Sequence, residues 1–399
     1  MDRRLLILAL GMFALGTDSF VVAGVLPQIS HTFHVGIGSA GQLTTVYAIT
    51  YAVLAPTIAA IAAGISRKTL LLSGLGVFVI ANLATAVAPT LAIALLTRMV
   101  AGVGAAMFAP TATGAAAMIV PPARRGFALS VVIAGLTAAT ALGSPTGAII
   151  GGLGDWRWTM VFVSALAGVS LLGILFLLSS IPLPPAISLK KRVAPITDPN
   201  VSLTLLTTMI YMSGIFTVYT YFSVIFDHVI GGRPLVLGGL LVLWGAAGTV
   251  ANLTSGRLID TIGNRKVILA MLVVLIADLA LIPSTSGQLA TAVIAIAVFG
   301  AVGWGLLVPQ QHRLVTLAPE TAPVVLGLNT ACTYLGVTTA GILGAIGIGS
   351  IGAHNLPFIS AVLCIVALIV SELASRRIAA NEAPVFPTSA NFIGATARP

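Results

Sequence analysis

Residues 5–30 read LLILALGMFALGTDSFVVAGVLPQIS, an apolar run long enough to cross a bilayer that carries one acidic residue, Asp18, near its middle. An Asp at the centre of a membrane helix costs roughly 2.5 to 3.5 kcal/mol on insertion scales, so it should face a partner, a wet cavity or a proton pathway. A structural hydrogen bond to a neighbouring helix is the alternative. Because ionisable residues inside a membrane are functional by default, Asp18 is the first candidate functional residue.

The whole chain shares the apolar character of this stretch. Hydrophobic residues make up 58% of the 399 positions and charged residues 7%, whereas about a quarter of the residues of a soluble domain are charged. Repeated apolar runs of about 20 residues indicate helices rather than a β-barrel. The first run lacks a small-residue cleavage site and is interpreted as a retained helix, not a signal peptide.

Twelve apolar runs predict an all-α membrane protein with twelve transmembrane helices. They lie at residues 5–29, 40–63, 69–88, 91–118, 126–150, 158–180, 201–226, 235–256, 266–286, 289–312, 322–348 and 355–375. A proline-rich and basic segment, 181–200, falls near the midpoint and predicts a linker between a six-helix half at 1–180 and another at 201–378. The tail, 379–399, lacks periodicity and is expected to be disordered.

A weak internal repeat supports the division into halves. The loop after the second run reads AAIAAGISRK (59–68), and the loop after the eighth reads GRLIDTIGNRK (256–266). Arg67 and Lys68 correspond to Arg265 and Lys266 with an offset of 265 minus 67, or 198 residues, which is half the chain.

The basic residues predict the orientation of the helices. If the amino terminus is cytoplasmic, 16 of the 19 basic residues fall inside, only Arg157 and Arg233 fall outside, and Arg98 lies within the membrane. The positive-inside rule then places both termini in the cytoplasm. The net charge of +9 is therefore a topology signal, and no nucleic acid is expected as a partner.

Several separate motifs resemble those of the major facilitator superfamily, and within it the twelve-helix drug:proton antiporter family. They are GRLIDTIGNRK, TRMVAGVGAAMFAP (97–110) and GLTAATALGSPTGAIIGG (135–152). The stretches SAGQLTTVYAITYAV (39–53), TVYTYF (217–222) and WGLLVPQQHRLVTLAP (304–319) are similar to a branch of bacterial exporters for purine nucleosides, arabinose-type sugars and chloramphenicol-like drugs. The resemblance covers essentially the whole chain and implies the major facilitator fold.

The chain departs from the family pattern at several positions. In the first-half loop, Ala59 and Ala63 replace the Gly and Asp of the signature, so Arg67 and Lys68 there are equally consistent with a topology role. Ser144 stands where the antiporter motif usually has Gly before Pro. The resemblance implies a gating role for the matching residues Gly143, Pro145, Gly147, Gly256, Asp260, Gly263, Arg265 and Lys266.

The resemblance also implies that Arg98 works in proton coupling. At about 1.5 Å per residue, Arg98 lies roughly 10 Å from the outer end of its helix and Asp18 roughly 20 Å from the inner end of its own. The two depths are similar, and a buried guanidinium is costly without a carboxylate or polar partner. Asp18 and Arg98 are therefore predicted to be the proton-coupling residues, with an Arg98 bonded to backbone carbonyls as the alternative.

The substrate is expected near the midplane between the halves. Polar and aromatic residues of the second, seventh, eighth, tenth and eleventh runs are the candidates to line this site. They are Tyr47, Tyr219, Tyr221, Trp244, Asn252, Trp304, Gln310, Asn329 and Tyr334. Each of these side chains also suits packing or an interfacial anchor, and Asp278 in the ninth run ranks below Asp18 as a second intramembrane acid.

The sequence offers no signal for catalysis, a cofactor or a metal. It contains no HExxH and no nucleophile with a base in a plausible site, and Asp227 with His228 is interpreted as a solvated pair. Cys332 and Cys364 fall inside apolar runs and are interpreted as small buried hydrophobes.

The leading hypothesis is a proton-coupled antiporter that exports small drugs or metabolites by alternating access, of the multidrug efflux type. It is expected to be a monomer, multi-pass in a bacterial inner membrane, with a small molecule, protons and lipid as partners. A proton-independent facilitator or importer with the same fold is the alternative, and a non-transporting membrane receptor is the rival from another class.

Overall fold

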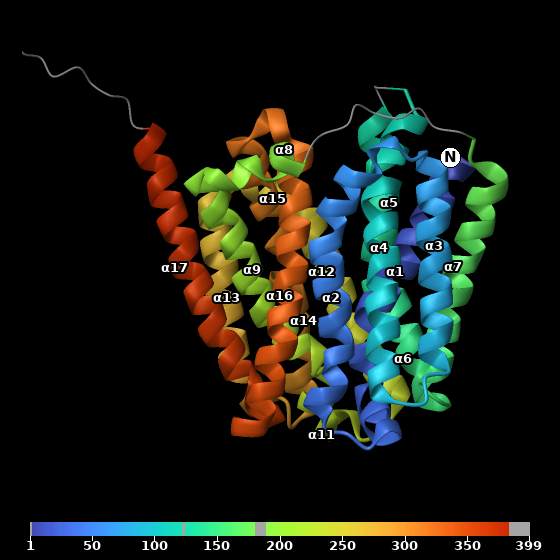
Figure 1. The fold of residues 1–399 in the computed structure, drawn as a ribbon. Coiled ribbons are helices and arrows are strands. Elements are labelled where there is room, and N and C mark those ends of the chain that lie inside the picture. Colours follow the sequence, from blue (N-terminus) through green and yellow to red (C-terminus); the bar gives the residue numbers. More distant parts are fainter. Residues whose placement is uncertain (1, 122–123, 180–188, 383–399) are drawn as a thin grey trace, which may run out of the picture.

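The computed structural model describes residues 2–121, 124–179 and 189–382, with the side chains of positions 59, 60, 63 and 382 excepted, and these ranges form a bundle of helices (Figure 1). The first half contains α1 (Arg3–Phe33), α2 (Ile37–Ile61), α3 (Arg67–Ala86), α4 (Leu91–Ile119), α5 (Arg125–Ala138), α6 (Ser144–Leu153) and α7 (Arg157–Leu177). The rest contains α8 (Leu189–Val193), α9 (Pro199–Thr220), α10 (Phe222–Ile225), α11 (Asp227–Ile230), α12 (Pro234–Ile262), α13 (Asn264–Thr285), α14 (Leu289–Gly305), α15 (Leu307–Leu317), α16 (Ala322–Ile351) and α17 (Leu356–Glu382). Short 3₁₀ turns and one π-helical turn connect some of these helices.

The predicted fold class, twelve transmembrane helices with no strands in the described residues, is confirmed. Eleven helical stretches in the described part of the chain are long and apolar enough to cross a membrane. The twelfth is α2, whose 25 residues contain no charged side chain. The seventh span is divided into α9, α10 and α11, and the tenth into α14 and α15.

The fifth span is also divided, and its division has a local cause. α5 and α6 are joined by a π-helical turn, Ala139–Gly143, followed at once by Pro145 near the start of α6. Proline has no backbone N–H to donate and its ring crowds the preceding turn, so a widened turn relieves both problems. The run predicted as one helix at 126–150 is therefore helical throughout, with a π-helical turn in its middle.

The helix ends differ from the predicted bounds where polar residues continue the helical pattern. α15 extends to Leu317, five residues beyond the predicted end at 312, and α17 extends to Glu382, into the segment predicted as a disordered tail. The second part of the predicted linker is helical, in α8 and a 3₁₀ turn at Ala194–Thr197. Positions 180–188 of the linker and 383–399 of the tail lie outside the described residues.

The same pattern of helix packing occurs twice along the chain. In the first half α3 packs on α4 and α7, α2 packs on α4, and α1 packs on α5 and α7. In the second half α13 packs on α14 and α17, α12 packs on α14, and α9 packs on α16 and α17. This repetition gives the two weakly similar loops at 59–68 and 256–266 equivalent places in the two halves.

The most extensive contacts between the halves in the described residues are those of α2 with α16 and of α6 with α12, and α1 also contacts α9 and α10. Figure 1 shows the chain start, α8 and the end of α17 at one end of the bundle and α11 at the other. We call the first the basic end, because two helices begin there with basic residues. α3 begins at Arg67, and α13 begins at Asn264, directly before Arg265. We call the second the opposite end.

Candidate functional site

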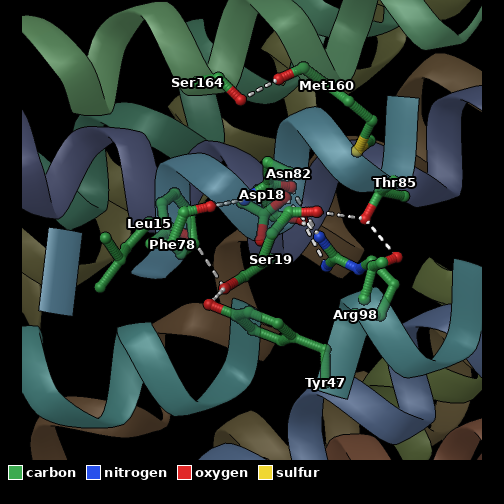
Figure 2. A network of polar contacts seen from close by, with 12 residues as sticks. Leu15, Asp18, Ser19, Tyr47, Phe78, Asn82, Thr85, Arg98, Met160 and Ser164 are labelled. Atoms are coloured by element: carbon green, nitrogen blue, oxygen red, sulfur yellow. Dashed lines mark hydrogen bonds and ion pairs between the residues drawn. The ribbon is translucent and has the colours of Figure 1, made fainter. Parts of the chain in front are cut away.

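A buried ion pair joins α1 to α4 in the first half (Figure 2). The Nη1 atom of Arg98 on α4 lies 2.6 Å from Oδ1 of Asp18 on α1, and the two side chains are 1% and 0% exposed. The similar depths predicted for these residues are thus matched by direct contact. Neither charge is isolated, which lowers the large cost of burying a single ion.

Two further side chains hold the guanidinium of Arg98. Its Nη1 also donates to Oδ1 of Asn82 on α3 at 3.2 Å, and its carbon atom Cζ lies 4.6 Å from the centre of the Tyr47 ring. Asn82 is fixed in turn because its Nδ2 donates to the carbonyl of Phe78 at 3.1 Å. A cation over an aromatic face and a charge-assisted hydrogen bond both fix the position of the Arg98 guanidinium between α2, α3 and α1.

The ion pair nevertheless retains hydrogen-bonding capacity. Among the described residues, Oδ2 of Asp18 and Nε of Arg98 are buried without a hydrogen-bond partner. An unsatisfied buried polar atom is costly, so these atoms mark where a proton or a polar ligand group would be stabilised.

The close approach of α2 and α4 explains how Tyr47 reaches Arg98. A Cβ atom added at Gly102 on α4 would lie 2.8 Å from the carbonyl oxygen of Tyr47 and 2.9 Å from Cβ of Thr50. Glycine at this position lets the two backbones approach, and small residues serve this purpose in membrane helices. Gly102, part of the motif beginning at Thr97, therefore positions the site through packing.

A polar network links the ion pair to the second half. The hydroxyl of Ser19, the residue after Asp18, lies 3.3 Å from the hydroxyl of Tyr47 and 3.3 Å from the hydroxyl of Tyr334 on α16. The Tyr334 ring lies against Tyr51 of α2, with ring centres 4.1 Å apart. Ser19 thus contacts one tyrosine from each half directly beside the titratable carboxyl.

An aromatic cluster extends this contact along the interface between the halves. Phe20 of α1 lies within 6 Å, centre to centre, of Phe216, Tyr219 and Trp304 from the second half. The Tyr219 hydroxyl lies 3.0 Å from the Ser144 hydroxyl on α6 and donates to the carbonyl of Phe20 at 3.2 Å. Trp244 completes the cluster, 4.3 Å from Tyr219 and 5.6 Å from Trp304.

Several polar atoms in the second half are also unsatisfied. Within the described residues, the indole nitrogens of Trp244 and Trp304 and both amide atoms of Gln310 and Asn329 are buried without a hydrogen-bond partner. The Oδ1 atom of half-buried Asn252 shares this property. The two indole nitrogens belong to the aromatic cluster, and donors beside ring faces suit the binding of a small molecule that has both polar and planar apolar parts.

The structure brings together some of the predicted substrate-binding residues and separates another. Tyr219, Trp244 and Trp304 share the aromatic cluster, and Tyr47 and Tyr334 share the polar network. Tyr221 lies apart from both groups because its hydroxyl donates to the carbonyl of Gly341 at 3.0 Å and its ring packs against the helix α16. The sequence-based grouping of Tyr221 with Tyr219 thus joins residues on different faces of one span.

The gating residues predicted in the fifth span lie against α1 close to the ion pair. A Cβ atom at Gly143 would collide with Thr17, and one at Gly147 would lie 2.5 Å from Val21. In the loop motif of the second half, Gly263 has a φ of 86°, and Asp260, Gly256 and Lys266 are exposed. Pro145 is buried within α6, which packs against α1 and α12.

The loop motifs of the two halves make comparable contacts at the basic end. Arg265 pairs with Glu372 of α17, with Nη2 and Oε2 2.5 Å apart. In the first half, the Nζ atom of Lys68 donates to the carbonyl of Leu175 of α7 at 2.8 Å. Each contact ties the third helix of a half to its sixth, although the first half lacks the signature acid.

Five residues of the polar network and the aromatic cluster were not among the candidate site residues from the sequence. They are Ser19, Phe20, Asn82, Ser144 and Phe216. A signal existed for Asn82, because an amide inside an apolar run needs a partner, and for Ser19 and Phe20, which flank Asp18. The places of Ser144 and Phe216 follow from the way α6 and α9 face α1, which is a tertiary property. Asp278, the second acid, lies on α13 with Oδ2 buried and without a partner in the described part of the chain.

The fold and the buried site define a class of protein. Twelve membrane-crossing helices in two similarly packed halves, with charged and polar groups at the centre of the bundle, are the architecture of a secondary transporter and not of an enzyme. Residues 8–337 match the family model described as Major Facilitator Superfamily, and the chain belongs to this family.

Curated relatives of this chain are similar over nearly their whole length. The chain is 28% identical over 377 residues to the inner membrane transport protein YdhP of Escherichia coli O157:H7, which covers 94% of this chain and 96% of that protein. It is 25% identical over 370 residues to the uncharacterized MFS-type transporter YbcL of Bacillus subtilis (strain 168), at 93% and 95% coverage. It is 28% identical over 389 residues to the uncharacterized MFS-type transporter YtbD of the same strain, at 94% and 96% coverage.

Proposed function

We propose that this transporter is a proton-driven exporter of small drugs or metabolites, with Asp18 as the carboxyl that takes up the proton and Arg98 as its electrostatic partner. The observation that carries the proposal is the buried pair of these residues, in which one carboxylate oxygen has no partner among the described residues. A carboxyl group in this position has two accessible protonation states. It is either ionised beside Arg98 or protonated, and the balance between them depends on its surroundings.

The contacts around Ser19 supply a physical route from proton uptake to helix movement. Protonation of Asp18 removes the charge that holds the Arg98 guanidinium, and Ser19 is the next residue on the same helix. Ser19 contacts Tyr47 in its own half and Tyr334 in the other. A change in the ion pair therefore alters hydrogen bonds that cross between the halves, which is the kind of linkage that biases two conformations.

Export follows if the proton and the substrate favour opposite-facing states. Protonation from one side and substrate binding from the other then compete through the same central site, and neither ligand alone completes the cycle. An electrogenic cycle gains about 2.3 kcal/mol for each net charge moved across 100 mV.

The side chains at the interface suggest the chemical class of the substrate. Phe20, Tyr219, Trp244 and Trp304 offer ring faces, and the unsatisfied indole nitrogens offer donors. This combination suits a small neutral or weakly polar molecule that carries a planar ring. The sequence resemblance to exporters of purine nucleosides and chloramphenicol-like drugs agrees with this class, because both kinds of molecule carry a planar ring, whereas arabinose-type sugars do not.

We further propose that the protein lies in a bacterial inner membrane as a monomer, with its basic end in the cytoplasm. The name of one relative, the inner membrane transport protein YdhP, places that protein in the inner membrane. The uneven distribution of the basic residues supports the orientation through the positive-inside rule. The division at 181–200 then becomes a cytoplasmic linker between the halves.

Purified protein in sealed liposomes that contain a pH-sensitive dye provides the test. A panel of chloramphenicol, a purine nucleoside and arabinose is added in turn, with and without an imposed pH gradient. The proposal expects at least one compound to release protons from the vesicles and to accumulate only when the gradient is present. Solute flux that does not depend on the pH gradient would identify a facilitator. The absence of flux for every compound of a broad panel would favour a receptor.

A further inference from the structure

Asp227, His228 and His354 form a compact cluster at the opposite end of the bundle, far from the ion pair. Asp227 and His228 begin α11, and His354 lies in the 3₁₀ turn Ala353–Asn355 between α16 and α17. The Nδ1 atom of His228 lies 3.0 Å and the Nε2 atom of His354 2.8 Å from the same oxygen, Oδ1 of Asp227. The expected solvated pair of Asp227 and His228 is therefore part of a cluster of three.

The backbone around the cluster holds the three side chains in place. The turn that carries Asp227 and His228 ends at Gly231, which has a φ of 55°, and the turn that carries His354 follows Gly352, which has a φ of 81°. Glycine tolerates these left-handed conformations without steric cost, so both turns are tight and defined. The two turns meet because α10 packs against the 3₁₀ turn at Ala353–Asn355.

The ligand atoms of the cluster have the chemistry and spacing of a transition-metal site. Each residue offers one ligand atom, and the three atoms lie within 4.8 Å of one another. Zinc binds imidazole nitrogen and carboxylate oxygen at about 2.0 to 2.2 Å in a tetrahedron, so its ligands lie roughly 3.3 Å apart. Small side-chain rotations bring the observed separations to this value.

The donor set also selects among metals. Two of the three ligands are imidazoles, which suit zinc, copper and nickel, whereas magnesium and calcium prefer oxygen ligands alone. The nearby Arg233 directs its guanidinium to the carbonyl oxygens of Ile230 and Val229, at 3.4 and 3.5 Å. Because Arg233 is directed to these carbonyls, the contacts of the Asp227 carboxylate are those with His228 and His354.

We propose that Asp227, His228 and His354 bind a divalent transition metal ion, with Zn²⁺ as the representative, at the surface of the opposite end. Three protein ligands leave a fourth position for water, and the side chains are 42% to 64% exposed, so the ion exchanges readily with solution. A bound ion ties the segment between α9 and α12 to the connection between α16 and α17. Ser223 in that segment donates to the carbonyl of Ala23 on α1, so the ion also steadies a contact between the halves.

Calorimetric titration of the full-length protein, purified without a polyhistidine tag, tests this proposal directly. With ZnCl₂ we expect one equivalent bound per chain and a higher melting temperature, and with MgCl₂ neither effect. His228→Ala and His354→Ala should each weaken the Zn²⁺ affinity at least tenfold and abolish the thermal shift. Bound Co²⁺ should show the visible absorption of a tetrahedral site in the unchanged protein and in neither of these two variants.

His31 and His34 provide a matched control at the same end of the bundle. Their rings lie 6.1 Å apart at the end of α1. The double variant His31→Ala with His34→Ala should bind Zn²⁺ as the unchanged protein does. Absence of Zn²⁺ binding, binding that survives in the His228→Ala and His354→Ala variants, or binding lost in the control would each overturn the proposal. None of these results depends on the proton-coupled export proposed for Asp18.

Discussion

Replacement of Asp18 by Asn tests the proposed coupling most directly. Asn has nearly the same size and still forms hydrogen bonds, but it cannot take up and release a proton. Moving one net charge across 100 mV supplies about 2.3 kcal/mol of driving force. A tenfold concentration ratio corresponds to about 1.36 kcal/mol. An uncoupled protein therefore loses roughly fifty-fold of substrate accumulation for each charge that it no longer moves at 100 mV. Downhill exchange of substrate should persist.

The same change has a second effect that needs a separate measurement. Arg98 is 1% exposed, and without the carboxylate it retains the hydrogen bond to Asn82 and the ring of Tyr47. Breaking a buried ion pair by removing one partner costs about 3 to 5 kcal/mol of stability. The double variant Asp18→Asn with Arg98→Gln removes both charges, so its melting temperature should recover while uphill transport stays absent.

The assay is substrate accumulation in proteoliposomes under an imposed pH gradient, with Asp278→Asn as the matched control. Asp278 is the same residue type, buried in another transmembrane helix without an ion-pair partner in the described residues. We expect this control to accumulate substrate as the unchanged protein does. Full pH-dependent accumulation by Asp18→Asn would refute the reasoning, and loss in the Asp278→Asn protein alone would move the coupling to that residue.

Three further predictions concern the interface between the halves and the orientation of the chain. Trp244→Ala should change the relative transport of different substrates more than it changes protein abundance, and equal loss of all substrates together with low abundance would assign Trp244 to packing. Tyr334→Phe removes a hydrogen bond worth about 0.5 to 1.5 kcal/mol, so the pH gradient needed for half-maximal transport should shift while melting temperature changes little; an unchanged profile would argue against the link through Ser19. Cysteines placed beside Arg67, Arg124 and Arg265 should react with an impermeant reagent only after the cells are opened. Labelling of these cysteines in intact cells would show that the basic end faces outward, against the prediction.

The class of the protein and its first candidate functional residue could be predicted from the sequence because they depend on local properties. Hydropathy over about 20 residues determines whether a helix crosses the membrane, and it located the twelve spans now present in the fold. An acid or a base inside such a run is visible without any structure, which is why Asp18 and Arg98 were found. Their depths follow from the constant rise of a helix, so even their proximity was foreseeable.

The partners of these residues were decided by tertiary structure. Most of these helices are apolar all round, so the sequence does not indicate which face of a helix meets which neighbour. The contact of Ser19 with Tyr334 joins residues 315 positions apart, and that of Asp227 with His354 joins residues 127 apart. Tyr219 and Tyr221 differ by two positions yet face different surroundings, because the rotation of α9 and its end at Thr220 are set by packing against α1, α16 and α17. Hydropathy and charge are properties of single residues and short windows, whereas a site is a set of contacts between helices, and only the packed bundle specifies these contacts.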